Sequence, residues 1–546
     1  MDQIGCGDVA GDDAFGPRLN SAAVDGAVTA LRAIVEHRRQ TRPHHRGRDG
    51  PPLGVHPPRP VRRRAQDEVW QHTGAGPARC ALTTKRELLA TQRGFTRGRW
   101  NCADTLPSLA TMERQDQRGK SSPVTAVNGK APWSHHDPYT DEALLDPWPG
   151  YKQLRDAGPA AWLPQYEMFA LTRYASVRRA LEDWEAFPSS YGVMMNDRMN
   201  QVLRGNTLCS DGADHDALRD VLVRPLTPRA LRPVRDEIRA EAEAVVEKLV
   251  GKGTFDAVTD LANHLPVTVV SNLVGLPEKG RERMLIWADE MFNCFGPIND
   301  RNSASFFVLD EMMHYATNEA VPDKLKSGGW AMGIHDAVAR GEVPAQACPA
   351  MMIDYLGPSL DSTIFAITNA VWLFAKYPDQ WDMVREDPRL IPSAINEVLR
   401  YDAPIRGFSR YVARDVDMDG VLLPAGSRAI VFYGAANRDE RKYPHPDRFD
   451  VLRRPGDHLG FGAGPHACVG MNLARIEMMA LFTELAKRVR RFTIEEEKRI
   501  PNNVLRGFTT CVSPSADTTA RSKRSTRALG QRCHVGGAER VLTHRR

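Results

Sequence analysis

HLGFGAGPHACVGMNLARIE, residues 458–477, is the stretch that decides the fold. Three glycines frame its single cysteine: Gly462, Gly464 and Gly470. Glycine permits positive φ angles and lets the backbone approach a flat ligand closely. Apolar residues then recur at three- and four-residue spacing from Leu473, which predicts a helix that begins just after Cys468. Since a helix N-terminus favours an anion, the pattern indicates a metal-bound Cys468 thiolate.

A lone cysteine is ordinarily a buried small hydrophobe, so the surrounding residues decide the interpretation. Phe461, the glycine spacing, His466 and the A-R-I-E continuation make the loop similar to F-G-x-G-x-[HR]-x-C-x-G, the haem-binding loop of the cytochrome P450 family. The resemblance implies haem b (iron protoporphyrin IX) with Cys468 as its axial thiolate. One cysteine suits haem, which supplies its own in-plane donors, better than zinc.

Further polar residues occur where this family has its haem contacts. Arg219 lies four residues after His215, so the two share a helix face. By resemblance, the residues that contact the haem and its propionates are His215, Arg219, Arg410, His458, Phe461, Gly462, His466 and Gly470. Glu397 and Arg400, three residues apart, resemble with Arg448 the family's Glu-Arg-Arg network, which has a structural role.

The distal side should come from one long helix over residues 344–376. The family pattern A-G-x-[DE]-T-T is replaced there by P-S-L-D-S-T, residues 358–363, and Pro358 should kink the helix. Asp361 and Ser362 keep the carboxylate and hydroxyl that the family uses to pass protons, and we expect them to be the catalytic residues.

Helical periodicity also covers residues 261–275, 378–402 and 470–491, and it is clearest in DEIRAEAEAVVEKLVGKG. Short β-rich pieces lie at 168–173 and 428–434. We therefore expect a mainly α protein with small β-sheets. The resemblance implies the triangular, prism-like cytochrome P450 fold, with haem between the long distal helix and the cysteine loop.

Charge and composition divide the 546 residues into three parts. Residues 131–514 hold 44 Lys and Arg against 53 Asp and Glu, whereas the two ends hold 29 against 15. Residues 1–130 are rich in Arg and Pro without sustained periodicity, and 515–546 are similar, so both are expected to be disordered basic extensions. The catalytic domain is expected to be 131–514.

Other features bear on location. No run of about 18 apolar residues occurs, as a membrane span would require. The nine cysteines form no C-x-x-C pair, and the first residues do not resemble a secretion signal. These observations predict a cytoplasmic protein with reduced thiols and no membrane association.

The sequence thus predicts a bacterial-type haem-thiolate monooxygenase that inserts one atom of O2 into a small hydrophobic or aromatic substrate by hydroxylation or O-dealkylation. No flavin fingerprint or iron–sulfur cysteine cluster is present, so electrons should come from NAD(P)H through a ferredoxin reductase and a ferredoxin, with Arg475 among the docking candidates. Two alternatives stay open: a peroxide-driven peroxygenase or isomerase, and a haem sensor with a nucleic-acid-binding basic arm. We do not expect a nucleic-acid partner.

The substrate pocket can be placed only by resemblance. Its candidate wall residues are Met194, Met195, Phe292, Phe295, Leu360 and Phe408. Methionine-rich walls adapt to different ligand shapes, so this set does not predict a particular substrate.

Overall fold

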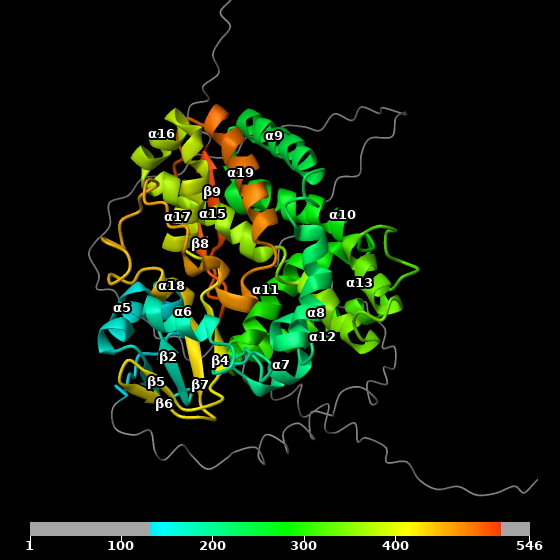
Figure 1. Ribbon diagram of the computed structural model, residues 1–546. Coiled ribbons are helices and arrows are strands. Elements are labelled where there is room, and N and C mark those ends of the chain that lie inside the picture. The colour runs from blue at the N-terminus through cyan, green and yellow to red at the C-terminus, as the bar shows by residue number, and fades with distance from the viewer. Residues whose placement is uncertain (1–130, 515–546) are drawn as a thin grey trace, which may run out of the picture. The chain divides into compact units, whose positions relative to one another are not determined.

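The computed structural model describes residues 131–514, which form a mostly helical fold with small sheets (Figure 1). The two basic extensions expected at 1–130 and 515–546 lie outside the described residues. Among residues 131–514, no helix is both long and apolar enough to cross a membrane.

The helices follow one another through the whole described region. Their bounds are α4 (Asp141–Leu145), α5 (Trp148–Ala157), α6 (Tyr174–Glu182), α7 (Asp197–Val202), α8 (Gly212–Val223), α9 (Val234–Lys252), α10 (Ser271–Val274), α11 (Met284–Phe295), α12 (Asp300–Asn318), α13 (Trp330–Ala339), α14 (Cys348–Leu356), α15 (Asp361–Lys376), α16 (Pro378–Glu386), α17 (Ile391–Tyr401), α18 (Tyr433–Ala436) and α19 (Met471–Arg488).

The strands form three small sheets. Their bounds are β1 (Ala161–Leu163), β2 (Met168–Leu171), β3 (Thr254–Asp256), β4 (Gly407–Tyr411), β5 (Val416–Met418), β6 (Val421–Leu423), β7 (Arg428–Phe432), β8 (Glu496–Arg499) and β9 (Phe508–Pro514). The largest sheet has the order β1-β2-β7-β4, in which only β2 and β7 are parallel. The others are β3-β9-β8 and the hairpin β5-β6.

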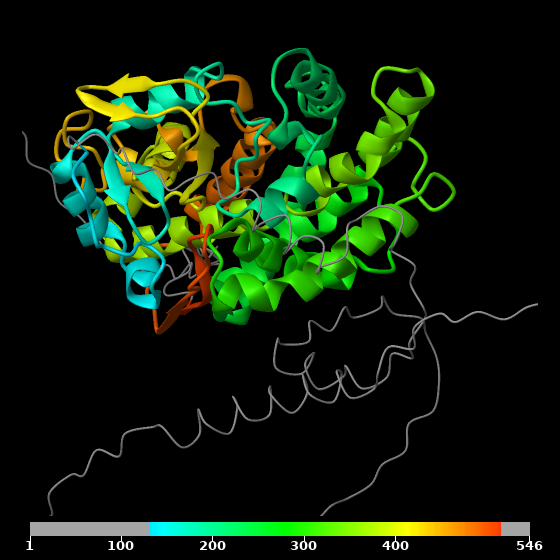
Figure 2. The same ribbon diagram turned by 90° about the horizontal axis from the view of Figure 1, so that it is seen from below.

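The largest sheet and the main helical core occupy different ends of the described region, whereas the sheet β3-β9-β8 packs against the helices, since β9 contacts α15. Helices α9 to α13 gather on one side in Figure 1, whereas the largest sheet lies with α5 and α6 on the other, and Figure 2 shows the same division from below. The main apolar core lies among the helices, and α15 contributes most of its residues to it. Since α15 packs against α17 and α19, the helix that follows the cysteine loop is anchored in this core.

The structure confirms the mainly α fold and shows which helix boundaries could not be predicted from local periodicity. Helix α9 buries Ile238, Ala242 and Leu249 on one face and ends before Gly253, which has a φ of 87° that suits glycine. The single helix expected over 344–376 is wrong. It is two helices, α14 and α15, separated by residues 357–360.

One further expectation differs from the structure. The periodic stretch 378–402 is also two helices, α16 and α17, since Asp387 leaves the helical conformation (φ −127°, ψ 90°). The chain turns polar after Thr509, yet residues 508–514 still form the central strand β9 of a sheet. Its side chains alternate, so buried Cys511 and Ser513 provide an inner face.

Candidate functional site

The cysteine loop is a compact turn whose shape depends on glycine. Two short 3₁₀ turns, residues 459–461 and 464–466, precede Cys468. The amide of Cys468 donates a 2.8 Å hydrogen bond to the carbonyl of Phe461, which closes the loop. At Gly464, with φ of 69°, a Cβ atom would lie 2.3 Å from the carbonyl oxygen of Leu181. Only glycine fits there, so the loop packs directly on the α6 backbone.

Cys468 is the only exposed thiol among the five described cysteines. Burial nevertheless raises its pKa, although hydrogen bonding from the Gly470 amide and the charge of Arg219 act in the opposite direction. The sulfur of Cys468 is accessible although protein surrounds it. Such a thiol faces an internal space. The amides at the start of α19 lower the pKa of this thiol, as expected, but do not outweigh burial, whereas a bound metal cation would do so.

The other described cysteines lack these properties. Cys209, Cys294, Cys348 and Cys511 are all buried. Burial raises the pKa of Cys348 to about 11 and those of Cys209, Cys294 and Cys511 to about 12. Within residues 131–514, no group of three or more His, Cys, Asp or Glu side chains is placed to hold a metal ion. The cysteine loop is therefore the place where a thiolate ligand is best supported.

Arg219 and His215 of α8 lie at this loop. Arg219 donates a 2.6 Å hydrogen bond to the carbonyl of Ala467, the residue before the cysteine. The rings of His215 and His466 lie 4.4 Å apart, and Nε2 of His466 is 3.5 Å from the Asp211 carboxylate. Burial lowers the pKa of His466, although Asp211 partly counteracts this. The structure thus brings α8 and the cysteine loop together as the sequence predicts.

His458 shows that the site fits an anionic ligand such as a haem propionate. Its Nδ1 accepts a 3.0 Å hydrogen bond from the amide of Gly460, so the proton of the neutral ring is on Nε2. That Nε2 is buried and has no hydrogen-bond partner in the described region, as is also true of His215 Nε2. Burial lowers the pKa of His458 to about 3, so the ring is neutral. An acceptor oxygen would satisfy this donor, as buried polar groups require.

Arg410 supplies a buried cation from β4. Only 3% of its surface is exposed, and one N–H donates to the Ser409 carbonyl at 2.8 Å. Its charge lowers the pKa of Tyr433, although burial raises that pKa overall. The charge of Cys468 also raises the pKa of Tyr433, so Arg410 lies at the edge of the same site. A doubly anionic macrocycle would find cations here on two elements, α8 and β4.

The helix break on the distal side has a simple cause. Pro358 has no amide hydrogen for the carbonyl of Asp354, and α14 accordingly ends at Leu356. The Ser359 hydroxyl donates to the Tyr355 carbonyl and so satisfies one of the last acceptors of α14. Helix α15 then begins at Asp361, which is 4% exposed. Ser362 is half-buried and donates a 3.2 Å hydrogen bond to the carbonyl of Pro358.

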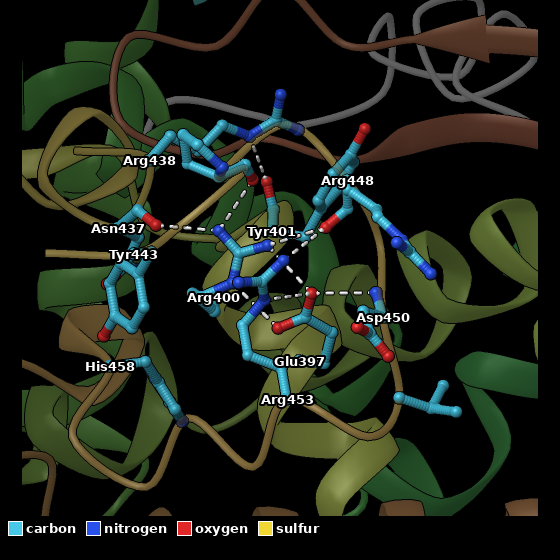
Figure 3. A network of polar contacts seen from close by, with 12 residues as sticks. Glu397, Arg400, Tyr401, Asn437, Arg438, Tyr443, Arg448, Asp450, Arg453 and His458 are labelled. Atoms are coloured by element: carbon cyan, nitrogen blue, oxygen red, sulfur yellow. Dashed lines mark hydrogen bonds and ion pairs between the residues drawn. The ribbon is translucent and has the colours of Figure 1, made fainter. Parts of the chain in front are cut away.

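The glutamate–arginine network differs from the expected one in one member. Arg400 donates two hydrogen bonds to Glu397, but the second guanidinium at Glu397 belongs to Arg453, at 3.2 Å (Figure 3). Arg448 is exposed and contributes its backbone carbonyl, which accepts from Arg400 and Arg453. The expectation that the Arg448 side chain joins Glu397 is corrected. The i,i+3 spacing identified the helical pair, whereas the loop conformation that selects Arg453 has no local sequence signal.

The candidate wall residues lie close together. The Phe295 ring is 5.4 Å from that of Phe292 and 6.4 Å from that of Phe408, and its carbonyl accepts from the Met195 amide at 3.0 Å. The Met194 carbonyl accepts from Ser409, the residue after Phe408. Leu360 is fully buried at the helix break.

Asp354 was not predicted from the sequence. It is an acid within the apolar run CPAMMIDYL of α14, and an acid in such a run is itself a signal of a special role.

The fold and the loop define a class: a mostly helical protein whose enclosed, accessible cysteine suits thiolate ligation of haem. A family model described as Cytochrome P450 matches residues 349–516. The protein named cytochrome P450 CYP199A2, from Rhodopseudomonas palustris, is 33% identical over 409 residues, which are 74% of this chain and 97% of the relative. The chain therefore belongs to the cytochrome P450 family, whose members are monooxygenases that bind haem through a cysteine thiolate.

Two further comparisons agree. A methyl-branched lipid omega-hydroxylase of Mycobacterium bovis is 27% identical over 423 residues, which are 71% of this chain and 97% of the relative. The solved structure of a mutant of P450 EryK in complex with erythromycin B is 26% identical. It has a TM-score of 0.62 and covers 70% of this chain and 98% of that one.

Proposed function

We propose that this cytochrome P450 inserts one oxygen atom from O2 into a small hydrophobic or aromatic substrate, by hydroxylation or O-dealkylation. The single observation that carries the proposal is Cys468, the one exposed thiol in the described region, enclosed by the loop and by α8. When bound there, haem would supply the redox chemistry that activates dioxygen, and thiolate ligation would favour cleavage of the O–O bond.

The residues of the chain would hold the cofactor as follows. Cys468 would be the axial ligand, and Gly462, which has a φ of 70°, and Gly470 would place no side chain against the macrocycle. Phe461 would pack beside the thiolate, with the Arg475 guanidinium 5.0 Å from its ring. Arg219 and Arg410 would supply positive charge to the propionates, and His215, His458 and His466 would donate ring N–H groups to them.

Asp361 and Ser362 would deliver protons from the first turn of α15. Retention of this acid–hydroxyl pair supports a dioxygen-dependent reaction over a peroxide-driven one, because a peroxide already carries the required protons. Residues 131–514 would be the catalytic domain, since every matched motif lies within them.

Electrons would come from NAD(P)H through a ferredoxin reductase and a ferredoxin, with Arg475 near the docking face. The five described cysteines are free, which suits the reducing cytoplasm, our proposed location. To test the proposal, full-length protein is combined with a surrogate ferredoxin system, NADPH and a panel of phenyl ethers and aromatic acids under ¹⁸O2. A hydroxylated product with one ¹⁸O atom supports the proposal. For O-dealkylation the phenol keeps the ether oxygen of the substrate, so phenol and aldehyde formed in proportion to the NADPH and O2 consumed support it. Product formed only with added peroxide contradicts it.

A further inference from the structure

Asp354 is an acid that the proposed proton delivery does not use. It lies on α14, one turn before the helix break, in an otherwise apolar run. We propose that Asp354 is a specificity-determining residue of the distal pocket, where its carboxylate binds a cationic N–H donor on the substrate and disfavours substrate carboxylates. The inference rests on the proposed monooxygenase function and assigns it a substrate class.

The two oxygens of this carboxyl group are in different situations. Oδ1 accepts a 3.3 Å hydrogen bond from the side-chain amide of Asn206, which also caps the turn of residues 207–209. Oδ2 is buried and has no well-formed hydrogen bond in the described part of the chain; Thr207, whose own hydroxyl also lacks a partner there, lies beside the carboxyl group and lowers its pKa. Buried acceptors ordinarily have a partner, so Oδ2 is a ready acceptor for a donor that enters the pocket.

The position of Asp354 connects it to the haem site. Cys209 lies at the end of the turn that Asn206 caps. Its pKa is raised by the charge of Asp354 and lowered by that of Arg410. The charge of Arg410 lowers the pKa of both His466 and Tyr433, and the charge of Cys468 raises the pKa of Tyr433. Through Asn206, Asp354 also binds the turn that leads into α8, whose Arg219 contacts the cysteine loop, so Asp354 lies where α14 meets the start of α8.

The environment of Asp354 makes its charge responsive to a ligand. Burial raises its pKa to about 7, against the opposing effect of hydrogen bonding to Thr207 and Asn206. Burial raises the pKa of two nearby groups, Cys209 on the turn and Tyr355 on its own helix, and the charge of Asp354 raises both pKa values further. Both stay neutral near pH 7. A cationic donor would thus bind to a carboxylate that has little other charge near it, whereas the carboxylate of a benzoate would be repelled by it.

Three planar ligands of nearly equal shape test this directly: 4-methoxybenzamidine, 4-methoxybenzamide and 4-methoxybenzoate. They differ chiefly in presenting an amidinium, a neutral amide or a carboxylate. Their dissociation constants are measured on full-length, haem-loaded protein at pH 8, by the Soret shift and by calorimetry. We expect the amidinium to bind most tightly and the benzoate most weakly. In Asp354→Asn the amidinium should lose about 10- to 100-fold in affinity, as for loss of a charge-assisted hydrogen bond, and the benzoate should gain.

A change of pH gives a second readout. At pH 6 the wild-type carboxyl group is mostly protonated, so the amidinium should bind more weakly than at pH 8. The Asn variant should show no such dependence, because the amidinium keeps its charge over this range.

Two control variants separate recognition from a structural role. Asp310 on α12 is another acid whose pKa is raised by burial, and Asp310→Asn should leave the order of the three ligands unchanged. Asn206→Ala removes the amide at Oδ1. If Asp354 only supports the turn, Asn206→Ala and Asp354→Asn should lower the unfolding midpoint alike and leave the ligand order intact, and that result would overturn the inference.

Failure of this inference is distinguishable from failure of the proposed function. A ferrous–CO spectrum typical of thiolate-ligated haem, combined with an unchanged ligand order in Asp354→Asn, overturns the substrate class alone. Absence of amidinium binding by wild-type protein with that spectrum overturns it as well. Loss of the thiolate-type spectrum from wild-type protein overturns the proposed function.

Discussion

Glu397 and Arg400 are joined by two hydrogen bonds of 2.8 Å, and neither side chain has any exposed surface. The remaining Arg400 donors bind the carbonyls of Asn437 and Pro446 at 2.9 Å and that of Arg448 at 3.4 Å, and Glu397 also accepts from the amide of Asp450. This ion pair therefore ties α17 to the long loop that leads to the cysteine (Figure 3). Its integrity should decide whether that loop holds its shape.

Arg400→Ala should destabilise the protein by about 3–5 kcal/mol, because it leaves a buried carboxylate with reduced compensation. Haem content should fall as the loop loosens. The measurement is the urea midpoint together with the haem-to-protein ratio. Lys152→Ala is the control, since Lys152 and Asp156 form an exposed i,i+4 pair that should contribute less than about 1 kcal/mol. Equal small effects of both substitutions would contradict the role of the network.

Arg453→Ala should destabilise the protein more than Arg448→Ala. The Arg453 guanidinium contacts Glu397 and the carbonyls of Pro444 and His445, whereas Arg448 acts through its backbone, which alanine retains. The same urea titration compares the two variants. A larger effect at Arg448 would restore the pairing first expected from the sequence.

Asp361→Asn should keep haem binding and substrate binding but slow turnover by about 10²–10⁴-fold, as is typical of lost acid–base assistance. Ser362→Ala should divert electrons into hydrogen peroxide, because reduction of dioxygen consumes protons whose delivery the hydroxyl directs. The measurement is product and peroxide formed per NADPH consumed. Wild-type coupling in both variants would mean that another hydroxyl at the helix break, such as that of Ser359, has taken over.

Glu477 on α19 should make stability depend on pH. Its side chain is 1% exposed, and burial raises its pKa to about 8. Because the unfolded chain releases this proton at a lower pH, stability should fall as pH rises from about 4.5 to 8. Each pKa unit corresponds to about 1.4 kcal/mol, so the loss is on the order of 5 kcal/mol. Glu477→Gln should remove it and be the more stable protein at pH 8.

Glu484 on the same helix is the matched control for that titration. Burial raises its pKa, but hydrogen bonds from Lys487 and Arg488 outweigh burial and lower it overall. Its contribution to stability is therefore present above the unfolded pKa, and Glu484→Gln should destabilise the protein at pH 8. If both glutamine variants shift the urea midpoint in the same direction at pH 8, the account of Glu477 is wrong.

The cysteine loop and α9 could be predicted because their signals are local: glycine positions in one case and helical periodicity in the other. The break at Pro358 was expected as a kink, but the extent of the interruption depends on which side chain replaces the missing amide, here that of Ser359. The choice of Arg453 over Arg448, and the half-satisfied carboxyl group of Asp354, depend on contacts between distant segments. The choice of Arg453 leaves no pattern in the sequence, and for Asp354 the signal is limited to an acid within an apolar run.

The central claim is that Cys468 is the thiolate ligand of haem. The most direct test is the ferrous–CO spectrum of wild-type protein, Cys468→Ala and Cys348→Ala, the last being a buried thiol near His335 that serves as the control. We predict the strongly red-shifted Soret band of thiolate-ligated haem in wild-type protein and in Cys348→Ala, and its loss in Cys468→Ala. Persistence of that band in Cys468→Ala would contradict the account.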